Sequence, residues 1–541
     1  MATSSCLHAT QVEEIKRIVG EAMYENEVVG PNGSPVSGGG TQRSNTAVII
    51  SNSWGQYNYQ AVVPTSITDN NDGTATIAGT SLKIYAGDTI SIGGMSTPRL
   101  NQIGATVLTA TIAGGLVTSA TYSTTGLYAA NAQQGGPYIY RAWRTSENGW
   151  WHIGAALADV NVRLLANYSS GGNDSEQLQA FLQNMVALAP KAAFFEIATN
   201  DVYARQWPAS RIIASHKIHI DTAIAAGITT VYALCPPRLD GAQNATFAAV
   251  IASVNNWAQY YVPSVGGYVV DTGSAAVAGV TMSDQTSAVA AASANVLSDG
   301  VHPGRRMAFA YGKALKPIMQ SLYPRLRIPA PWERAENGKF WGNTRLTGIT
   351  GTKSPGSGVI NGNVPDGMSI INNSGSHTID LSIVACTEAV DGTAVGSKLR
   401  AVITNATSAS NIVFRWAGTP ANWSHADAMG AFVRVSVSSS GTPGSGAPAS
   451  MMMPQLHLGC STSTTGIDDA YANAMISGNN SSIGVDEAYT ITLTTPHVAL
   501  KSGGVGIHGA LAYLRHEVEV LFRGSGSATV DIYHPMIYVP S

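Results

Sequence analysis

Short apolar runs alternate with segments of helical spacing between residues 46 and 322 of the chain. The apolar runs end at glycine, proline or small polar residues, as buried strands do. The expected strands cover residues 46–50, 159–166, 192–199, 229–235 and 268–272, and the expected helices cover residues 175–189, 209–226, 244–262 and 304–322. Because largely apolar strands that alternate with helices form parallel sheets covered on both faces, this pattern predicts a three-layer α/β/α domain.

Two further segments have the pattern of short strands separated by turns. Residues 62–140 carry only five charged side chains and alternate Thr, Ile and Val with turn sequences, which predicts an inserted all-β module. Residues 341–541 have the same texture and predict a C-terminal β-sandwich. The expected units are an N-terminal helix and linker (1–45), the α/β domain in two parts (46–61 and 141–330), the inserted module and the sandwich.

Composition narrows the classes of function. Charged residues make up only 12% of the 541 residues, hydrophobic residues make up 44%, and the net charge is −3. A disordered chain would have fewer hydrophobic and more charged residues. A nucleic-acid-binding protein would have an excess of Lys and Arg, so we expect no nucleic-acid partner. No apolar run approaches the ~20 residues that span a membrane, and the N-terminus lacks a secretory signal pattern. We therefore expect synthesis in the cytoplasm and no membrane partner. Four scattered cysteines indicate neither a disulfide framework nor a zinc site.

Three polar segments lie at boundaries of the expected strands and helices. Residues 51–55 (SNSWG) follow the first strand, residues 198–201 (ATND) directly follow the FFEI of the strand predicted at 192–199, and residues 299–303 (DGVHP) precede the last helix. The carboxyl ends of parallel strands share one edge of a sheet, so the first two segments are expected to face one crevice. A hydroxyl, an amide and a D-x-x-H pair in one crevice supply the nucleophile, oxyanion donor, base and orienting acid of a serine hydrolase.

These segments, in this order, resemble the signature blocks of the SGNH (GDSL-type) hydrolases. Ser53 stands at the nucleophile position, Gly171 is the best match to the Gly block, and Asn200 matches the Asn block. The resemblance covers residues 46–61 and 141–325. Two positions depart from the family pattern: Ser-Asn replaces Gly-Asp before the nucleophile, and Ala198 replaces the first Gly of the Asn block. The first departure leaves Ser51 as an alternative nucleophile, and the register favours Ser53.

The resemblance implies an esterase that needs no cofactor and no metal. His302 would take the proton of Ser53, and Asp299 would orient His302. The backbone N–H groups of Ser53 and Gly171 and the side-chain amide of Asn200 would form the oxyanion hole.

Other polar residues carry weaker patterns. His216, His219 and Asp221 share a predicted helix in a spacing that could hold a metal, but a solvated helix face is the preferred interpretation. Tyr203 and Arg205 follow the Asn block and are candidates to line the cleft.

The regions outside the α/β domain suggest a substrate class. Trp416, Trp423 and Tyr471 are candidates to bind glycans, although a place in the core is as good an interpretation. The glycine-rich turns at 342–367 and the C-terminal segment look like terminal domains of bacteriophage tail proteins. Hydrolases that resemble this layout remove O-acetyl groups from bacterial surface polysaccharide, which implies an acetylated glycan as partner, a place in a virion or at an extracellular surface, and a homo-oligomer, trimeric if a virion spike.

Two alternatives stay open. One is a non-catalytic glycan-binding receptor or tail protein on a decayed hydrolase scaffold, which the two departures from the motif favour. The other is a lipase or thioesterase of the same fold.

Overall fold

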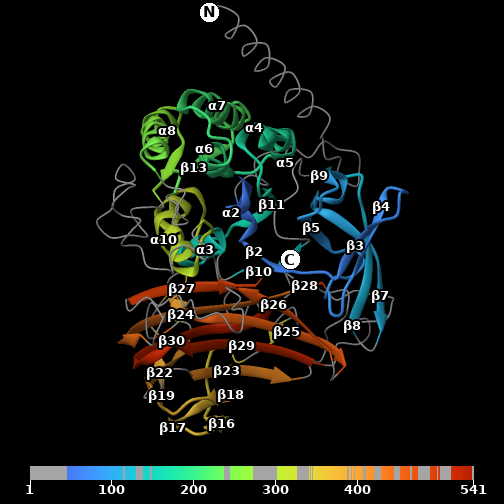
Figure 1. The fold of residues 1–541 in the computed structure, drawn as a ribbon. Coiled ribbons are helices and arrows are strands. Elements are labelled where there is room, and N and C mark those ends of the chain that lie inside the picture. The colour runs from blue at the N-terminus through green and yellow to red at the C-terminus, as the bar shows by residue number, and fades with distance from the viewer. Residues whose placement is uncertain are drawn as a thin grey trace, which may run out of the picture.

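The fold was determined from a computed structural model, which describes most of the chain from residue 45 onward (Figure 1). The described residues are 45–113, 116–128, 138–146, 149–236, 244–271, 301–325, 340–341, 343, 345–386, 389–390, 393–394, 396–405, 410–418, 428–443, 451, 453–463, 466–472, 488–495, 498–499 and 513–538. The N-terminal helix expected within residues 1–45 lies outside them. None of the described helices is long and apolar enough to span a membrane.

A five-stranded parallel sheet forms the centre of the α/β domain. Its strands, in spatial order, are β11 (Arg163–Ser169), β1 (Thr46–Ser51), β12 (Ala192–Glu196), β13 (Thr229–Ala233) and β14 (Tyr268–Val270). Each neighbouring pair runs parallel. The chain therefore adds β11 on one side of β1 and then crosses over to add β12, β13 and β14 on the other side. The order in which strands are added thus reverses beside β1. Ligands bind at such a reversal, beyond the carboxyl ends of the strands.

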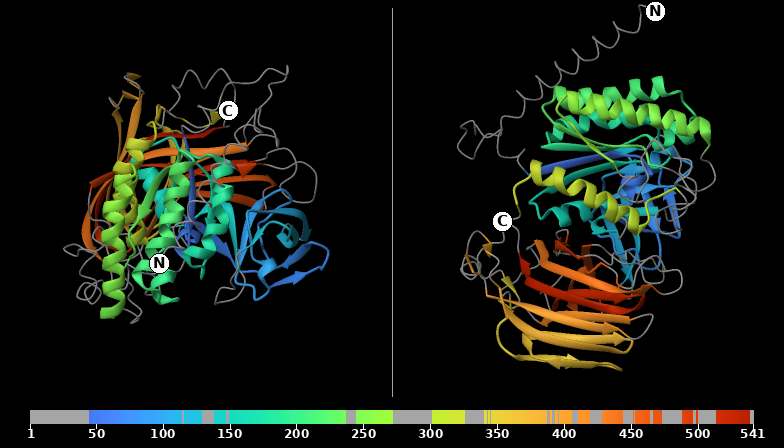
Figure 2. Two further views of the ribbon diagram at one scale, coloured as in Figure 1. Left: turned by 90° about the horizontal axis from the view of Figure 1, so that it is seen from above. Right: turned by 90° about the vertical axis from the view of Figure 1, so that its left-hand side faces the viewer.

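Helices cover both faces of this sheet, which Figure 2 shows in its right-hand view. Along β1, Ala47 and Ile49 belong to one hydrophobic cluster, while Val48 and Ile50 belong to another. The first cluster includes α3 (Trp150–Ala158) and α10 (Arg305–Leu322). The second includes α4 (Ser175–Leu178), η2 (Gln179–Phe181), α5 (Leu182–Leu188), α7 (Ala209–Ala225) and α8 (Ala245–Ser264). The alternation of side chains along a strand thus sends neighbouring residues into different layers.

Small residues bring α3 and α10 together. A Cβ atom on Gly312 would lie 2.9 Å from the backbone nitrogen of Gly154, so the two helices touch at glycine. Nearby, the rings of Trp150 and Tyr311 stack with centroids 4.3 Å apart. This contact fixes α10, whose N-terminal end follows His302.

The expected alternation of strands and helices is confirmed, but several elements differ in extent, and the strand expected at 192–199 ends at Glu196. The strand expected at 159–166 runs from Arg163 to Ser169, because α3 occupies residues 150–158 and ends at Asp159 in a left-handed conformation. The helix expected at 175–189 is divided into α4, η2 and α5, all at least partly packed against the sheet.

The rest of the described chain is mainly β. Residues 59–145 form β2 (Tyr59–Val62), β3 (Ser66–Asp69), β4 (Thr74–Ala78), β5 (Thr89–Gly93), η1 (Pro98–Leu100), β6 (Gln102–Ile103), β7 (Ala105–Ala113), β8 (Leu116–Ser123), β9 (Leu127–Tyr128) and β10 (Tyr138–Thr145). Most of these strands contribute to a hydrophobic cluster of their own.

The C-terminal strands form two large sheets, stacked below the α/β domain in Figure 1, and one separate two-stranded sheet at 389–390 and 393–394. They are β15 (Phe340–Trp341), β16 (Thr350–Ser354), β17 (Val359–Gly362), β18 (Val364–Ser374), β19 (His377–Ala385), β20 (Ala389–Val390), β21 (Thr393–Ala394), β22 (Ser397–Asn405), β23 (Ser410–Gly418), β24 (Ala428–Pro443), β25 (Gln455–Ser463), β26 (Gly466–Ala472), β27 (Ala488–Thr494), β28 (Val498–Ala499), β29 (Tyr513–Phe522) and β30 (Gly524–Tyr538). Pairing of β26 with β10, at Tyr471 and Arg144, joins the inserted strands to one of these sheets.

One of the aromatic residues considered for glycan binding lies in the core. Trp416 is only 2% exposed and stands edge-on to His516. Its burial excludes it from a surface that stacks on sugars. The side chain of Tyr471 and the whole of Trp423 lie outside what the structure describes.

Candidate active site

The sequence-predicted nucleophile and base lie together at the carboxyl edge of the sheet. Ser53 begins the short helix α2 (Ser53–Gln56) directly after β1, at the point where the strand order reverses. The Oγ atom of Ser53 lies 2.9 Å from Nε2 of His302, which precedes α10. Both side chains are partly exposed, so a substrate can reach them. When Nε2 carries no proton, His302 accepts the hydroxyl proton of Ser53, which is the geometry of an activated nucleophile.

Ser51, the alternative nucleophile, is buried and fully engaged. Its hydroxyl donates to Oε2 of Glu196 at 3.0 Å and accepts the backbone N–H of Gly55 at 2.9 Å. Ser51 therefore ties the end of β1 to the end of β12 and to α2. It holds the turn that carries Ser53, while Ser53 itself faces His302.

Two further contacts shape this turn. Oδ1 of Asn52 accepts the N–H of Trp54 at 3.1 Å and caps α2. Gly55 has no room for a side chain, because a Cβ atom would lie 1.9 Å from Oγ of Ser169 and 2.6 Å from Cβ of Ser51. The turn thus favours glycine, which has no Cβ atom, two positions after Ser53.

Aromatic side chains hold His302 against the nucleophile turn. The ring of Tyr57 stacks on the imidazole with centroids 4.9 Å apart and planes 23° from parallel. The indole N–H of Trp54 donates to the carbonyl oxygen of Val301, the residue before His302, at 3.1 Å. The indole of Trp150 donates in turn to the carbonyl oxygen of Trp54 at 3.0 Å. His302 is therefore positioned by residues within and directly after the short helix that carries Ser53.

Asp299, the expected orienting acid, lies outside the described residues. Its relation to His302 stays a prediction from the D-x-x-H spacing.

The candidate oxyanion donors come from adjacent loops. Gly171 is buried in the loop after β11, and the neighbouring N–H of Ser170 donates to the carbonyl oxygen of Ser51 at 3.0 Å. Asn200, in α6 (Thr199–Tyr203) beyond β12, donates one amide hydrogen to the carbonyl oxygen of Asn173 at 2.8 Å. A side-chain amide has two hydrogens, so the second remains available to a substrate oxygen. The loops of Gly171 and Asn200 are thus fixed to each other and to the nucleophile strand.

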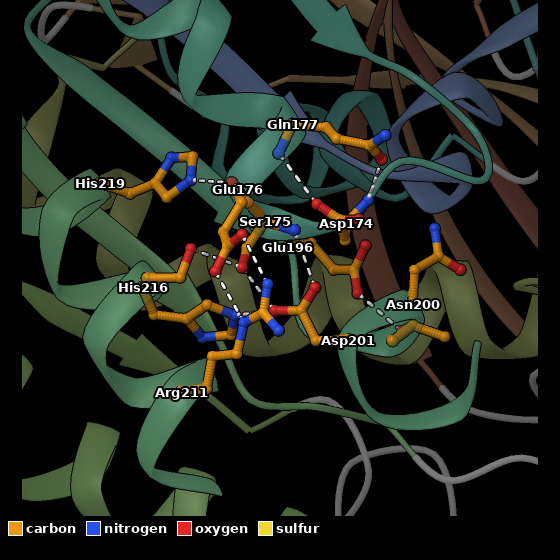
Figure 3. A network of polar contacts seen from close by, with 12 residues as sticks. Asp174, Ser175, Glu176, Gln177, Glu196, Asn200, Asp201, Arg211, His216 and His219 are labelled. Atoms are coloured by element: carbon orange, nitrogen blue, oxygen red, sulfur yellow. Dashed lines mark hydrogen bonds and ion pairs between the residues drawn. The ribbon is translucent and has the colours of Figure 1, made fainter. Parts of the chain in front are cut away.

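A buried carboxylate, Asp201, clamps these two loops together (Figure 3). It accepts the backbone N–H of Ser175 at 2.8 Å and the Ser175 hydroxyl at 2.5 Å, both at the start of α4. Nε2 of His216 lies 2.9 Å from the same carboxylate, and Nδ1 of His216 lies 2.6 Å from the hydroxyl of Tyr232. The network fixes how far the Gly loop stands from Asn200.

The interpretation of His216 and His219 as part of a solvated helix face is wrong. Both are fully buried in α7, and Nε2 of His219 lies 2.7 Å from the carbonyl oxygen of Ser175. Burial lowers the pKa of His219 to about 4, so it is neutral at pH 7. Asp221 is bonded to Lys217 and Tyr261 instead. Within the described part of the chain, no group of three or more His, Cys, Asp or Glu side chains is placed to hold a metal ion.

Of the two residues considered for the cleft, neither presents a free side chain. Tyr203 is 7% exposed and packs edge-on against Phe247 in a hydrophobic cluster. Arg205 forms an ion pair with Asp174, with Nε 2.8 Å from Oδ2. Asp174 caps α4, so this pair supports the Gly loop.

Glu196, the last residue of β12, is a residue of the site that was not predicted from the sequence. It is 1% exposed and accepts hydrogen bonds from Ser51 and from Oγ1 of Thr199, the latter at 3.2 Å. Burial raises the pKa of its carboxyl from 4.5 to about 7, against these hydrogen bonds, which lower it. The sequence did contain a signal, because Glu196 is a lone acidic residue in an otherwise apolar strand. An acidic side chain is rarely buried in such a strand unless polar groups bind it.

Comparisons with known proteins give distant matches among solved structures. No protein-family model and no curated protein sequence matches the chain. Among solved structures, a GDSL-like lipase from Bacteroides thetaiotaomicron is 16% identical, with 29% of this chain and 75% of that chain covered and a TM-score of 0.25. A lipase/acylhydrolase from Enterococcus faecalis is 12% identical, with 33% and 88% covered and a TM-score of 0.27. A carbohydrate esterase of family 3 from Talaromyces cellulolyticus is 20% identical, with 29% and 71% covered and a TM-score of 0.22. These values are too low to establish the family or the activity of this chain.

Proposed function

We propose that this chain is a serine ester hydrolase with Ser53 as nucleophile and His302 as general base. The observation that carries the proposal is the 2.9 Å contact between Ser53 Oγ and His302 Nε2 at the carboxyl edge of the parallel sheet. An exposed serine alone is a poor nucleophile, and a base at hydrogen-bond distance is what activates it.

The reaction follows from this pair. As Oγ of Ser53 attacks the ester carbonyl carbon, its proton passes to Nε2 of His302. The tetrahedral intermediate collapses, His302 returns the proton to the leaving alcohol, and an acyl-enzyme remains. Water, deprotonated by His302, then attacks the acyl group, and release of the acid returns the proton to Ser53.

The remaining roles are proposed from the order of the motifs. The N–H groups of Ser53 and Gly171 and the free amide hydrogen of Asn200 would stabilise the oxyanion, and Asp299 would orient His302. The clamp of Asp201 supports this proposal, because an oxyanion hole stabilises charge only when its donors are fixed in advance.

The alternative of a decayed, non-catalytic scaffold rests on the two departures from the family motif. Both are accommodated locally. Ser51 has partners for its hydroxyl in Glu196 and Gly55. Ala198 has φ −88° and ψ −27°, a conformation that any residue adopts, so no glycine is required there. Neither departure disturbs Ser53 or His302, which favours the enzyme over the receptor.

The finer proposal is that the substrate is an acetyl ester on a bacterial surface polysaccharide, met by a virion-borne or extracellular oligomer. It is supported by the sequence resemblance and by the large β portion of the chain. A lipase or thioesterase would instead prefer long acyl groups.

Hydrolysis of p-nitrophenyl esters tests both levels. We expect Ser53→Ala to reduce hydrolysis of the acetate to background, and Ser51→Ala, the matched control, to remain active. Acetate should be preferred over octanoate. Full activity of Ser53→Ala would refute the nucleophile, preference for octanoate would favour a lipase, and glycan binding by a wild type without turnover would favour the receptor.

A further inference from the structure

A cavity of about 440 Å³ lies where the α/β domain meets the C-terminal sheets. Its walls come from the end of α3, from the second half of α10, and from β24 and β27. The volume is within the range of cavities that hold small ligands. Polar groups dominate the walls, among them the side chains of Gln320, Thr490 and Thr492.

The charges around this cavity are unequal. Lys316, Arg325 and Arg434 line it, against one carboxylate, Asp159. Arg434 is only 3% exposed and forms an ion pair with Asp159, and Nε of Arg325 lies 2.8 Å from Oδ2 of the same carboxylate. Burial raises the pKa of Asp159. The hydrogen bonds from Arg434 and Arg325 and the charge of Arg434 have the larger effect and hold the pKa of this carboxyl below its usual value. The walls therefore carry a positive excess, in a chain whose net charge is −3.

Two of the cations retain capacity to bind a ligand. Lys316 is exposed and forms no ion pair with any residue that the structure describes. Arg325 is 68% exposed and uses Nε for Asp159, so its guanidinium presents further N–H groups outward. An ammonium and a guanidinium at one opening suit a carboxylate.

Neutral hydrogen-bonding groups accompany these charges. The Gln320 amide donates to the carbonyl oxygen of Ala158 at 3.2 Å, which leaves its own oxygen as an acceptor. The Thr490 hydroxyl shares a hydrogen bond with Ser436 and, like any hydroxyl, can serve a second partner. Hydroxyl-rich ligands match such walls.

The cavity is separate from the candidate active site. Lys316 lies eleven residues after Arg305, the first residue of α10, which is about 17 Å along the helix axis. Tyr323, on the cavity wall, donates to the carbonyl oxygen of Thr46 at the start of β1, whereas Ser53 follows the end of that strand. The two sites are therefore at opposite edges of the sheet.

We propose that this cavity binds a saccharide unit that carries a carboxylate. The carboxylate lies between Lys316 and Arg325, and the sugar hydroxyls bond to Gln320 and Thr490. The further statement, that the bound chain is also the substrate of the Ser53 site, rests on the proposed function. A polymer held at one edge of the sheet would then present its esters at the other edge.

Calorimetry of the full-length Ser53→Ala protein with an oligogalacturonate and its fully methyl-esterified form tests the proposal. The two probes share one sugar backbone and differ in the methyl groups that remove the carboxylate charge, and the inactive protein cannot hydrolyse the methyl esters. We expect binding of the free acid, weaker binding of the methyl ester, and an affinity that falls with salt. Adding Lys316→Ala should weaken binding of the acid about threefold and Lys316→Glu about tenfold, as expected for exposed ion pairs. Lys353→Ala, an exposed lysine of β16 that does not line the cavity, should have no effect.

Each outcome decides the proposal. Absence of binding, equal binding of the two probes, or affinity unchanged by Lys316→Glu would overturn it. Because Lys316 is exposed, its loss does not endanger folding, and hydrolysis of p-nitrophenyl acetate by Lys316→Glu with Ser53 intact should equal the wild type. A wild type without esterase activity would refute the proposed function and leave the binding result standing.

Discussion

Replacement of Glu196 by glutamine should change how the stability of the protein depends on pH. The Glu196 carboxyl is buried beneath the nucleophile turn, and its pKa is raised from 4.5 to about 7 in the fold. Such a carboxyl holds its proton more tightly in the folded protein than in the unfolded chain. Its contribution to stability is therefore fully present below about pH 4.5 and is lost as the pH rises through 7.

The size of the effect follows from the two pKa values. Each tenfold change in proton affinity corresponds to ~1.4 kcal/mol, so ionising this carboxyl in the fold costs about 3 kcal/mol at high pH. Part of this penalty is already present at about pH 5. Between about pH 5 and about pH 8, wild-type protein should lose about 2–3 kcal/mol that the glutamine variant does not lose.

Urea unfolding at the two pH values measures this difference. The buried indoles of Trp54, Trp150 and Trp151 report on the α/β domain. Because the two proteins differ only at residue 196, the difference between their unfolding free energies at each pH cancels the contributions of the other titrating groups. The reasoning would be refuted if the stability difference between wild type and Glu196→Gln were the same at both pH values.

Three further substitutions probe the site. Removing the stacked ring by Tyr57→Ala should lower kcat/KM about three- to tenfold, while Tyr57→Phe keeps the stack and most of the activity; equal losses would mean that the ring does not position His302. Asn200→Ala should lower kcat by ~10²–10³ with little change in KM, and an unchanged kcat would remove it from the oxyanion hole. Gly55→Ala should destabilise the protein by about 1–3 kcal/mol in a thermal melt, because its new Cβ collides with Ser169; an unaltered melting temperature would contradict the crowding described here.

The sheet and the positions of Ser53, Asn200 and His302 were predictable because local signals define them. Apolar runs bounded by polar turns gave β1 and β12, and the rule that carboxyl ends share an edge brought Ser53 and Asn200 to one side. His302 was placed by its position before an amphipathic helix.

Helix α3 could not be predicted, because burial removes the periodicity that reveals a helix. It lies between the parallel sheet and the C-terminal sheets and contacts β27, so Trp150, Trp151 and Ile153 are all buried. Without a polar face its sequence has no helical alternation. The pairing of β26 with β10 was hidden for another reason, because contacts between distant segments leave no local pattern.

The burial of His216 could have been predicted from the pattern of the helix that carries it. His216 and His219 share a stripe of α7 with Ile212, Ile220 and Ala223, all of them buried. Spacing on an apolar stripe indicates burial, and a buried histidine needs polar partners. Those partners, Asp201 among them, come from segments that the helix pattern does not reveal.

The central claim is that Ser53 is the activated nucleophile. Labelling with an alkyl fluorophosphonate, followed by peptide mass spectrometry, tests it most directly, since only a serine activated by a neighbouring base reacts readily. The account predicts one phosphonyl group on the peptide that contains Ser53, located on Ser53 by fragmentation and lost in both Ser53→Ala and His302→Ala. A label on Ser51, or no label on wild-type protein, would contradict it.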